Sequence, residues 1–537
     1  MRWQWGFVAL ASAALSVFAA GDAVAMCGCM VPIRPANAPV EEQNALLNKA
    51  TVVVMLREGT HTVLSFQNDY FGPAEDFGLV VPVPVVLHDE DVSTLDRGMF
   101  DRVQAVAAPH MVELYEQNPC PAPPSTGRGM NDALGGLAAR GGGAGAAQSE
   151  GGAMRPPVVV EEQFSEGEYD ISILGASDST ALEQWLNDNG YRLPRGSARY
   201  LRPYVQAGMK FFVARVDIGR LRQIAAHRQR VLRQQRWMSP ALRQLLRGPP
   251  ADIATSAQLG RFLSPLRMHY ESEEFALPVR LGLINSTGEQ DLIVHILSTE
   301  GRYEVANYGN RWVPTNVHVN GRAAQNFGRF YDALFGTLSA RAPRRVWTEY
   351  AGPITPIQAP PQMQGGGLGM FGMPARARPA GGRGGPVGCI GCSRPGLSAT
   401  DLRALGEEIV HPGDGDRIDE YTLTRLHYRY GQRGLPNDLV FRQGRAMAGG
   451  VEPATDRRLR RRPRRAERND YRVRFVAQHR WAGAVRCENP RRGNWGGRPS
   501  FGGVYRESEE REWPEDRPIP LGGWIRDSVP QLGIRGR

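Results

Sequence analysis

The clearest hydrophobic pattern of the chain lies in residues 265–310. Apolar and polar residues alternate over 266–270 and again over 275–283, which places apolar side chains on one face of a strand. Residues 292–297 are almost continuously apolar, as in a strand covered on both faces, and turn-forming residues separate these runs. The stretch therefore predicts a β-meander at the centre of the fold. Pro278 interrupts the second run, which predicts an edge strand or a bulge there.

Similar patterns predict elements on either side of this stretch. Further strands are expected at 51–56, 62–66, 77–84, 158–160, 169–174, 209–216, 345–350, 421–430 and 470–480. Helices are expected at 93–117, 178–189, 198–206, 219–247, 326–338 and 400–405. Because strands and helices mix without a strict βαβ repeat, the order predicts an α+β fold: two lobes of mostly antiparallel sheet with packed helices.

The composition divides the chain into folded blocks and inserts. Its 63 Gly and 40 Pro cluster in stretches that lack the apolar side chains needed to offset ordering entropy, which predicts disordered Gly/Pro/Arg-rich inserts. At 537 residues the chain also exceeds the size at which one core stops growing. The expected order is a signal peptide at 1–25, a first lobe at 26–118, an insert at 119–157, a central lobe at 158–352, an insert at 353–388, a C-terminal segment packed on the core at 389–445, a basic disordered linker at 446–468, a final strand at 469–487 and a disordered tail at 488–537.

The N-terminus reads as an export signal. Residues 8–20 form an apolar run too short to span a bilayer, and residues 23–25 offer a small-x-small cleavage site before Met26. We therefore expect export to the periplasm or the extracellular space, and no transmembrane span in the mature chain. A lipoprotein acylated on Cys27 is the alternative, but Met26 stands where such a site would carry a small residue.

The cysteine count favours disulfides. An even number in an oxidising compartment predicts three bonds among fifteen possible connectivities. The six residues are Cys27, Cys29, Cys120, Cys389, Cys392 and Cys487. The first two are too close for an easy mutual bridge, whereas the CxxC pair could close on itself. A redox CxxC and a zinc site built from both pairs are weaker alternatives, because the CxxC follows a Gly/Pro linker and the two pairs lie far apart.

The net charge of +10 comes almost wholly from arginine, for which a coding bias is the simplest explanation. An exported protein meets little nucleic acid, so an anionic envelope polymer or lipid head groups are the better electrostatic partners. The expected helix at 219–247 has eight Arg and no acid. It is either a solvated helix that packs on its other side or a dock for an anionic surface. The contacts of such a dock would be Arg228, Arg230, Arg233 and Arg236.

Motifs of known chemistry are missing from the sequence. It has no GxSxG, HExxH, P-loop or dinucleotide fingerprint. Asp414, Asp416, Asp419 and Glu420 lack the spacing of a calcium loop and read as a solvated turn. His295, between Ile and Val, reads as a hydrogen-bonded core histidine. We therefore predict no catalytic residue, metal or cofactor, and expect a binding or structural module; a hydrolase with dispersed residues is the alternative.

Several blocks together carry a family resemblance. They include Cys-Gly-Cys at 27–29, Val-Val-Pro-Val-Pro at 80–84, Leu-Pro-Val-Arg-Leu-Gly-Leu-Ile-Asn at 277–285, Gln-Asp-Leu-Ile-Val-His at 290–295 and Thr-Arg-Leu-His-Tyr-Arg-Tyr at 424–430. With these blocks the chain resembles an exported bacterial family of unknown function. That resemblance implies no established activity and therefore no catalytic residue. The polar face beside Pro278, with Arg280, Asn307 and Asn310, is where we expect a binding surface.

Overall fold

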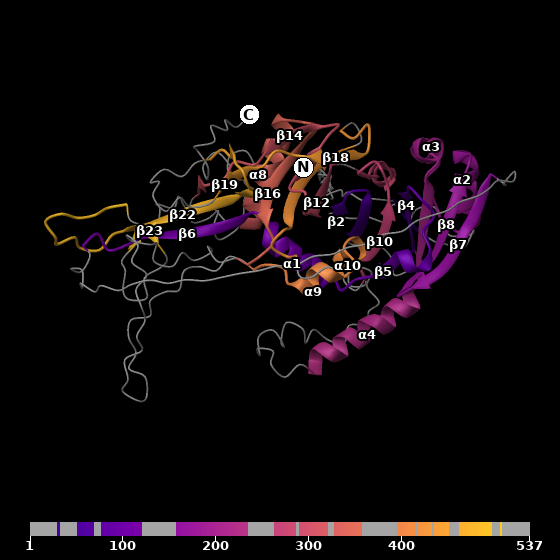
Figure 1. Ribbon diagram of the computed structural model, residues 1–537, viewed down its shortest axis with the longest axis horizontal. Helices are drawn as coiled ribbons and strands as arrows, with labels where there is room; N and C mark the ends of the chain where they lie inside the picture. The colour runs from indigo at the N-terminus through magenta and orange to yellow at the C-terminus, as the bar shows by residue number, and fades with distance from the viewer. Residues whose placement is uncertain are drawn as a thin grey trace, which may run out of the picture.

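The computed structural model describes residues 29–32, 51–68, 77–120, 157–234, 263–285, 289–319, 327–356, 395–413, 417–431, 434–450, 461–493, 495–496 and 505–506. A large sheet lies in the middle of the molecule (Figure 1). A second sheet with two helices lies at one end, and a narrow arm of strands projects from the other.

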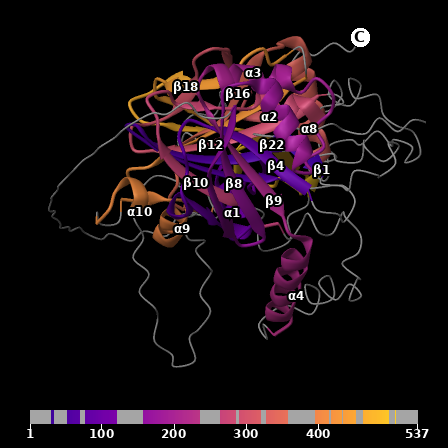
Figure 2. The same cartoon turned by 90° about the vertical axis from the view of Figure 1, so that its right-hand side faces the viewer.

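The end sheet has five antiparallel strands. Their order is β1 (Cys29–Pro32), β4 (Phe77–Val83), β9 (Lys210–Val216), β8 (Tyr169–Ala176) and β7 (Val158–Glu166). Helices α2 (Ser179–Asp188) and α3 (Ala198–Gln206) cover one face, where Leu182 and Leu186 pack on Phe211. The side chain of Asp178 accepts a 2.7 Å hydrogen bond from the Ala181 backbone N–H and caps α2, as its sequence predicts. Helix α4 (Ile218–Gln234) leaves this sheet and extends away from the body (Figure 2).

The central sheet gathers eleven strands from distant parts of the chain. Their order is β20 (Arg464–Arg465), β19 (Met447–Gly449), β21 (Asp470–Arg472), β16 (Arg345–Pro353), β17 (Thr422–Tyr430), β12 (Gln290–Ser298), β2 (Thr51–Glu58), β3 (His61–Asn68), β10 (Leu266–Glu271) and β5 (Val92–Thr94), with β14 (Gly309–Trp312) beside β16. Most pairs are antiparallel, whereas β12 runs parallel to β2. The continuous apolar runs of β2 and β12 follow from this position, because both faces are covered.

Two layers of side chains form the main core. One face of the central sheet packs on the end sheet, with Val53 and Val294 beside Phe212. The other face is covered by helices, which are α1 (Gly98–Ala107), α9 (Ala399–Ala404), α10 (Glu407–Val410) and, over β16 and β17, α8 (Phe327–Arg341). This arrangement of antiparallel sheets and packed helices confirms the α+β prediction.

Smaller sheets complete the fold. Three short strands, β11 (Ala276–Leu277), β18 (Leu439–Gln443) and β13 (Tyr303–Val305), form one of them. The projecting arm consists of β15 (Val317–His318), β22 (Arg474–Trp481), β6 (His110–Glu116), β23 (Trp495–Gly496) and β24 (Tyr505–Arg506). A disulfide between Cys120 and Cys487, with a Cα–Cα distance of 5.6 Å, joins the chain segments that follow β6 and β22.

The meander prediction is wrong. Strand β10 pairs with β3 and β5, β11 pairs with β18, and β12 pairs with β2 and β17, so no strand of 265–310 pairs with the next one. The strand expected over 275–283 ends at Leu277, and the 3-10 helix η3 (Arg280–Asn285) follows. Pro278 accounts for this end, because it has no N–H to donate to the ladder. Leu281 and Leu283 are nevertheless buried, and this burial produced the strand-like pattern.

Other boundaries differ for local reasons. The helix expected at 93–117 ends at Ala107 because Pro109 disfavours helical backbone at Ala108, and the remainder forms β6. Strands β19 and β20 lie in the stretch predicted as a disordered linker, and β23 and β24 lie in the predicted tail. Strand β23 pairs with the distant β6, whereas β19, β20 and β24 pair with strands nearer in the chain; a local hydrophobic pattern does not reveal these pairings. The predicted lobe boundaries stay a prediction.

Candidate functional site

Charged side chains gather on one face of three neighbouring strands of the central sheet. On β17, Arg425, His427 and Arg429 share a face because they are two residues apart. The register places Asp291 of β12 opposite Arg429. Strand β16 adds Glu349, which sits at a β-bulge between Thr348 and Tyr350. A bulge of this kind re-aims a side chain, and here Glu349 reaches the cationic face of β17.

These groups form one ionic network. The two ring nitrogens of His427 lie 2.7 Å from Glu349 Oε1 and 3.1 Å from Asp291 Oδ1. Arg425 Nε donates to Glu349 Oε2 at 2.6 Å, and Arg429 donates to both carboxylate oxygens of Asp291 at 2.8 and 2.6 Å. Both nitrogens of His427 therefore face carboxylates, which favours the doubly protonated ring.

The protonation preferences follow from burial and from these neighbours. Burial lowers the pKa of His427, but Glu349 and Asp291 outweigh it, and the pKa lies above its ordinary value. Burial raises the pKa of Glu349, but the positive charges of His427 and Arg425 outweigh it and bring it to about 2. The pKa of Asp291 is also lowered, since His427 and Arg429 outweigh its burial. The network is thus held in its charged form.

Helix α8 covers the centre of this network. Phe335 of α8 stacks on the His427 ring with centroids 3.6 Å apart and planes 4° from parallel. Tyr331 of the same helix donates to Glu349 Oε1 at 2.5 Å. The Glu349 side chain is fully buried, and that of His427 is 8% exposed. Both ring nitrogens and one ring face of His427 are therefore occupied, and the buried centre of the network, Glu349 with His427, is tied into the fold.

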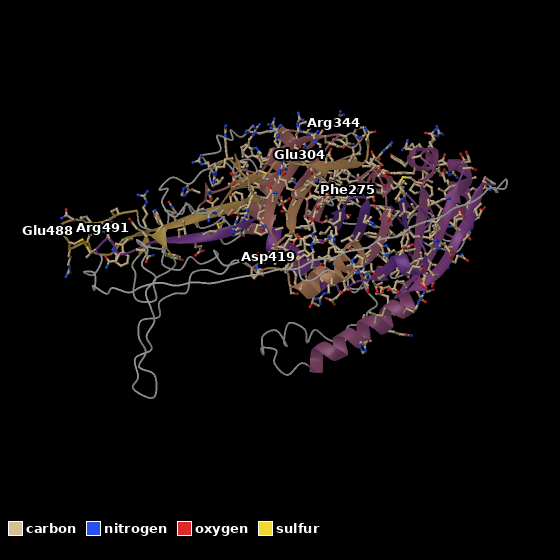
Figure 3. All side chains as sticks on the ribbon, in the orientation of Figure 1. Phe275, Glu304, Arg344, Asp419, Glu488 and Arg491 are labelled. Carbon is tan, nitrogen blue, oxygen red and sulfur yellow. A yellow bond between two sulfur atoms is a disulfide. The ribbon has the colours of Figure 1, made fainter. Side chains whose placement is uncertain are left out.

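An open site lies on the surface beside β16, where this strand changes its pairing partner. Strand β14 pairs with the first half of β16 and β21 with the second, and beside this junction the surface has a cleft of about 290 Å³. We call this hollow the arginine cleft. Its arginines are Arg302, Arg311, Arg445, Arg464 and Arg465. Glu304, labelled in Figure 3 in the upper part of the molecule, is its one carboxylate among the described lining residues.

The charges of the arginine cleft do not balance. Arg302 is 9% exposed and donates to Glu304 at 2.9 Å, so these two groups neutralise each other. Glu304 also accepts a 3.0 Å bond from Arg442 outside the cleft. The other arginines are exposed, and within the described part of the chain none of them forms an ion pair: Arg311, Arg445, Arg464 and Arg465. The cleft therefore presents an excess of positive charge to solvent.

One side of the arginine cleft is apolar. Trp312 is partly buried and packs against the core beneath α8, while Ala446, Met447 and Pro463 line the cleft with it. Asn310 lies between the two sides, but its amide is already used: Oδ1 accepts from the Val305 N–H at 3.0 Å and Nδ2 donates to the Val305 carbonyl at 2.7 Å. The cleft thus combines guanidinium groups with a fixed apolar wall.

A second hollow, of about 470 Å³, lies beside β3 and β10. It contains two histidine–carboxylate pairs, His61 with Glu271 at 3.3 Å and His269 with Asp91 at 3.6 Å. Among the described lining residues, Thr62 is the one serine or threonine. Its side chain is 2% exposed and accepts a hydrogen bond from Arg57. The hollow has bases but no accessible nucleophile of this type.

The residues predicted as a binding surface occupy two places. Arg280 and Asn307 meet at Asp438, which accepts the Arg280 backbone N–H at 3.0 Å and whose carbonyl accepts from Asn307 at 2.7 Å. Asn310 instead lines the arginine cleft. The predicted surface therefore touches the cleft at one of its three residues, and its binding role stays a prediction.

The other predicted residues are only partly described. Arg228, Arg230 and Arg233 fall on α4, whose backbone is described, and Arg236 lies outside the described residues. Cys29 begins β1, and the remaining cysteine candidates, Cys27, Cys389 and Cys392, lie outside. So do Asp414 and Asp416, while Glu420 pairs with Arg417 at 2.7 Å.

Two further features of the described residues concern membrane-spanning helices and metal-binding groups. Among the described residues no helix is both long and apolar enough to cross a membrane. Over those residues there is also no group of three or more His, Cys, Asp or Glu side chains placed to hold a metal ion.

Sequence reasoning missed both charged sites. The alternation of Arg425, His427 and Arg429 is visible in the sequence, but a charged strand face normally points to solvent, and only pairing with Asp291 and Glu349 shows its burial. The arginines of the cleft come from four separate segments and carry no local signal.

A family model matches most of the chain. The model described as "Uncharacterized protein conserved in bacteria (DUF2330)" matches residues 22–235 and 251–442, which is more than half of the chain. No curated protein and no solved structure matches the chain.

Proposed function

Since the chain belongs to the DUF2330 family of uncharacterized bacterial proteins, we propose its function from its own geometry: it is an exported cell-envelope protein that binds an anionic ligand in the arginine cleft and catalyses no reaction. The observation that carries the proposal is the group of exposed arginines around one hollow that form no ion pair with any other described residue.

Neighbouring guanidinium groups repel one another unless an anion lies between them. Each presents a planar fork of N–H donors that matches a carboxylate or a phosphate in a bidentate geometry. Charge-assisted hydrogen bonds of this kind are roughly twice as strong as neutral ones. An anionic ligand would therefore relieve the repulsion and satisfy the exposed donors of Arg311, Arg464 and Arg465 together.

The chemistry of the lining residues favours binding over turnover. The described lining of the arginine cleft contains no histidine and no cysteine, and Glu304 is committed to Arg302 and Arg442. A general base beside a nucleophile, which hydrolysis by side chains needs, is not assembled from these residues. The His427 network, which has the charged groups, is covered by α8.

Two features support an extracytoplasmic location. Residues 1–25 have the pattern of an export signal. The Cys120–Cys487 bond is of a kind that persists in oxidising compartments and is rare in the cytosol. An anionic polymer or lipid head group of the envelope is then the available partner.

Binding of polyanions tests the proposal. We expect polygalacturonate and polyphosphate to bind the mature protein in equilibrium dialysis, and neutral dextran not to bind. The double variant Arg464→Gln/Arg465→Gln should weaken binding of the polyanions by at least about tenfold. The control Arg195→Gln/Arg202→Gln removes the same charge at exposed residues near α3. Equal losses in the two variants, or equal binding of dextran, would refute a site in the cleft.

Fractionation of cells tests the location separately. The protein should be recovered in the periplasmic or extracellular fraction, shortened by its first 25 residues. A full-length cytoplasmic protein would contradict export while leaving the binding test intact.

A further inference from the structure

The arginine cleft has two unlike sides, and a ligand must satisfy both. We propose, building on the anion-binding function above, that its ligand is an acidic sugar: a ring that carries a carboxylate or a phosphate. The acidic group would lie among the arginines, and the ring would lie against Trp312. This assignment rests on the size of the cleft, on the fixed position of the indole and on the polar atoms that remain available.

The size of the cleft and its apolar wall together favour a ligand of intermediate size. At about 290 Å³ it lies near the lower end of the roughly 300 to 1,000 Å³ that small-molecule pockets occupy. A bare phosphate ion would reach the arginines and leave the apolar wall of Ala446, Met447 and Pro463 unused. The acyl chains of a lipid would not fit in such a hollow. A single sugar unit with an acidic substituent matches the space.

The indole of Trp312 is held in place before a ligand arrives. Trp312 belongs to β14, which is paired with β16, and its side chain packs on the core that includes Phe475 and Trp347. The part of the side chain that lines the cleft is therefore a rigid apolar surface, and binding to it costs little conformational entropy. The C–H face of a pyranose ring is an apolar surface of suitable shape, whereas its acidic group points away from that face.

A nucleotide also combines a flat ring with an anion, but the cleft is poorly equipped to recognise a base. Proteins read a base through hydrogen bonds to its edge. Asn310, whose side chain is the one amide of the described lining, is engaged at both amide atoms by Val305. Most of the remaining side-chain donors of the described lining are guanidinium groups, which suit oxyanions; the others are the Trp312 indole N–H and the hydroxyl of Thr348, which is 3% exposed. We therefore favour the acidic sugar and treat the nucleotide as an outcome of the test.

Calorimetric titration distinguishes these ligands. The mature protein is titrated with tri-galacturonic acid, the corresponding neutral galactose trisaccharide, inorganic phosphate and AMP. The acidic trisaccharide should bind at least about tenfold more tightly than each of the other three. Trp312→Ala should weaken its binding about tenfold and leave that of phosphate within about twofold, whereas Trp312→Phe, which keeps an aromatic ring, should stay within about threefold of the wild type.

The possible results separate this inference from the proposed function. If phosphate binds as tightly as the acidic trisaccharide, or if Trp312→Ala does not change the preference, the sugar assignment is wrong while anion binding stands. Tighter binding of AMP would replace the sugar with a nucleotide. If none of the anions binds, both proposals fail. Trp312→Phe, checked by its thermal midpoint, separates loss of the stacking surface from loss of the fold.

Discussion

Replacing Glu349 by Gln should destabilise the protein strongly, because this carboxylate is the buried partner of two cations. Its side chain is fully buried and accepts bonds from Arg425 at 2.6 Å and His427 at 2.7 Å. Gln has nearly the same shape, so the change removes charge with little loss of volume. Breaking a buried ionic network by removing one partner costs about 3–5 kcal/mol, since an uncompensated buried charge remains. We expect Glu349→Gln to lower the free energy of unfolding by this amount.

Urea denaturation followed by circular dichroism measures this change. A matched control is Glu408→Gln, which breaks the 3.5 Å ion pair of Glu408 with Arg403. The Arg403 side chain is 51% exposed and the Glu408 side chain is 70% exposed. Exposed pairs of this kind contribute about 0–1 kcal/mol, so the control should shift the unfolding midpoint little. If Glu349→Gln costs no more than Glu408→Gln, the network does not stabilise the fold and our reasoning fails.

The remaining predictions concern pH, packing and the disulfide. The pKa of Glu349 is lowered to about 2, so the stability that its charge contributes should be fully present at pH values above the ordinary pKa of a glutamate and be lost as the pH falls toward 2. The pKa of His427 is raised, so the stability that its protonated ring contributes should be fully present below about pH 6.5 and be lost at higher pH. Urea midpoints that stay flat between about pH 3 and pH 9 would contradict the network. Phe335→Ala should cost about 3–5 kcal/mol and Phe335→Leu clearly less, measured by the same denaturation, since Phe335 is fully buried against His427 and Leu fills most of its volume; equal costs would contradict the packing role. Reduction of the Cys120–Cys487 bond, which links residues 367 apart, should lower the free energy of unfolding by several kcal/mol, roughly 6 in the chain-entropy model. Mass spectrometry after thiol labelling should find both cysteines unlabelled before reduction; labelling of either one without reductant would contradict the bond.

The sequence predicted elements whose signals are local. Helix α2 was predictable because Asp178 caps it and Gly190 ends it, and β2 and β3 because β-branched runs flank a turn at Gly59, whose φ of +54° suits glycine. The α+β class followed from the mixed order of such elements.

Features that depend on long-range pairing were not predictable in this way. Apolar and polar residues do alternate in 265–310, but β10 and β12 are not paired with each other. Leu281 is buried on a 3-10 helix, and in the sequence this gives the same pattern as a residue buried on a strand. The network needs Asp291, Glu349 and His427 from three separate strands. The arginine cleft likewise joins β14 to a run of arginines at 464–465 that alone resembles a linker. In each case the partner lies more than 50 residues away.

Calorimetric titration of polygalacturonate into the triple variant Arg311→Gln/Arg464→Gln/Arg465→Gln tests the central claim most directly. Each guanidinium should contribute a charge-assisted bond, so the variant should bind at least about 100-fold more weakly than the wild type. The control Arg195→Gln/Arg202→Gln/Arg222→Gln, with the same net charge, should stay within about threefold. A loss confined to the first variant is what our account predicts. Equal losses in both would show that the ligand responds to overall charge and that the cleft is not its site.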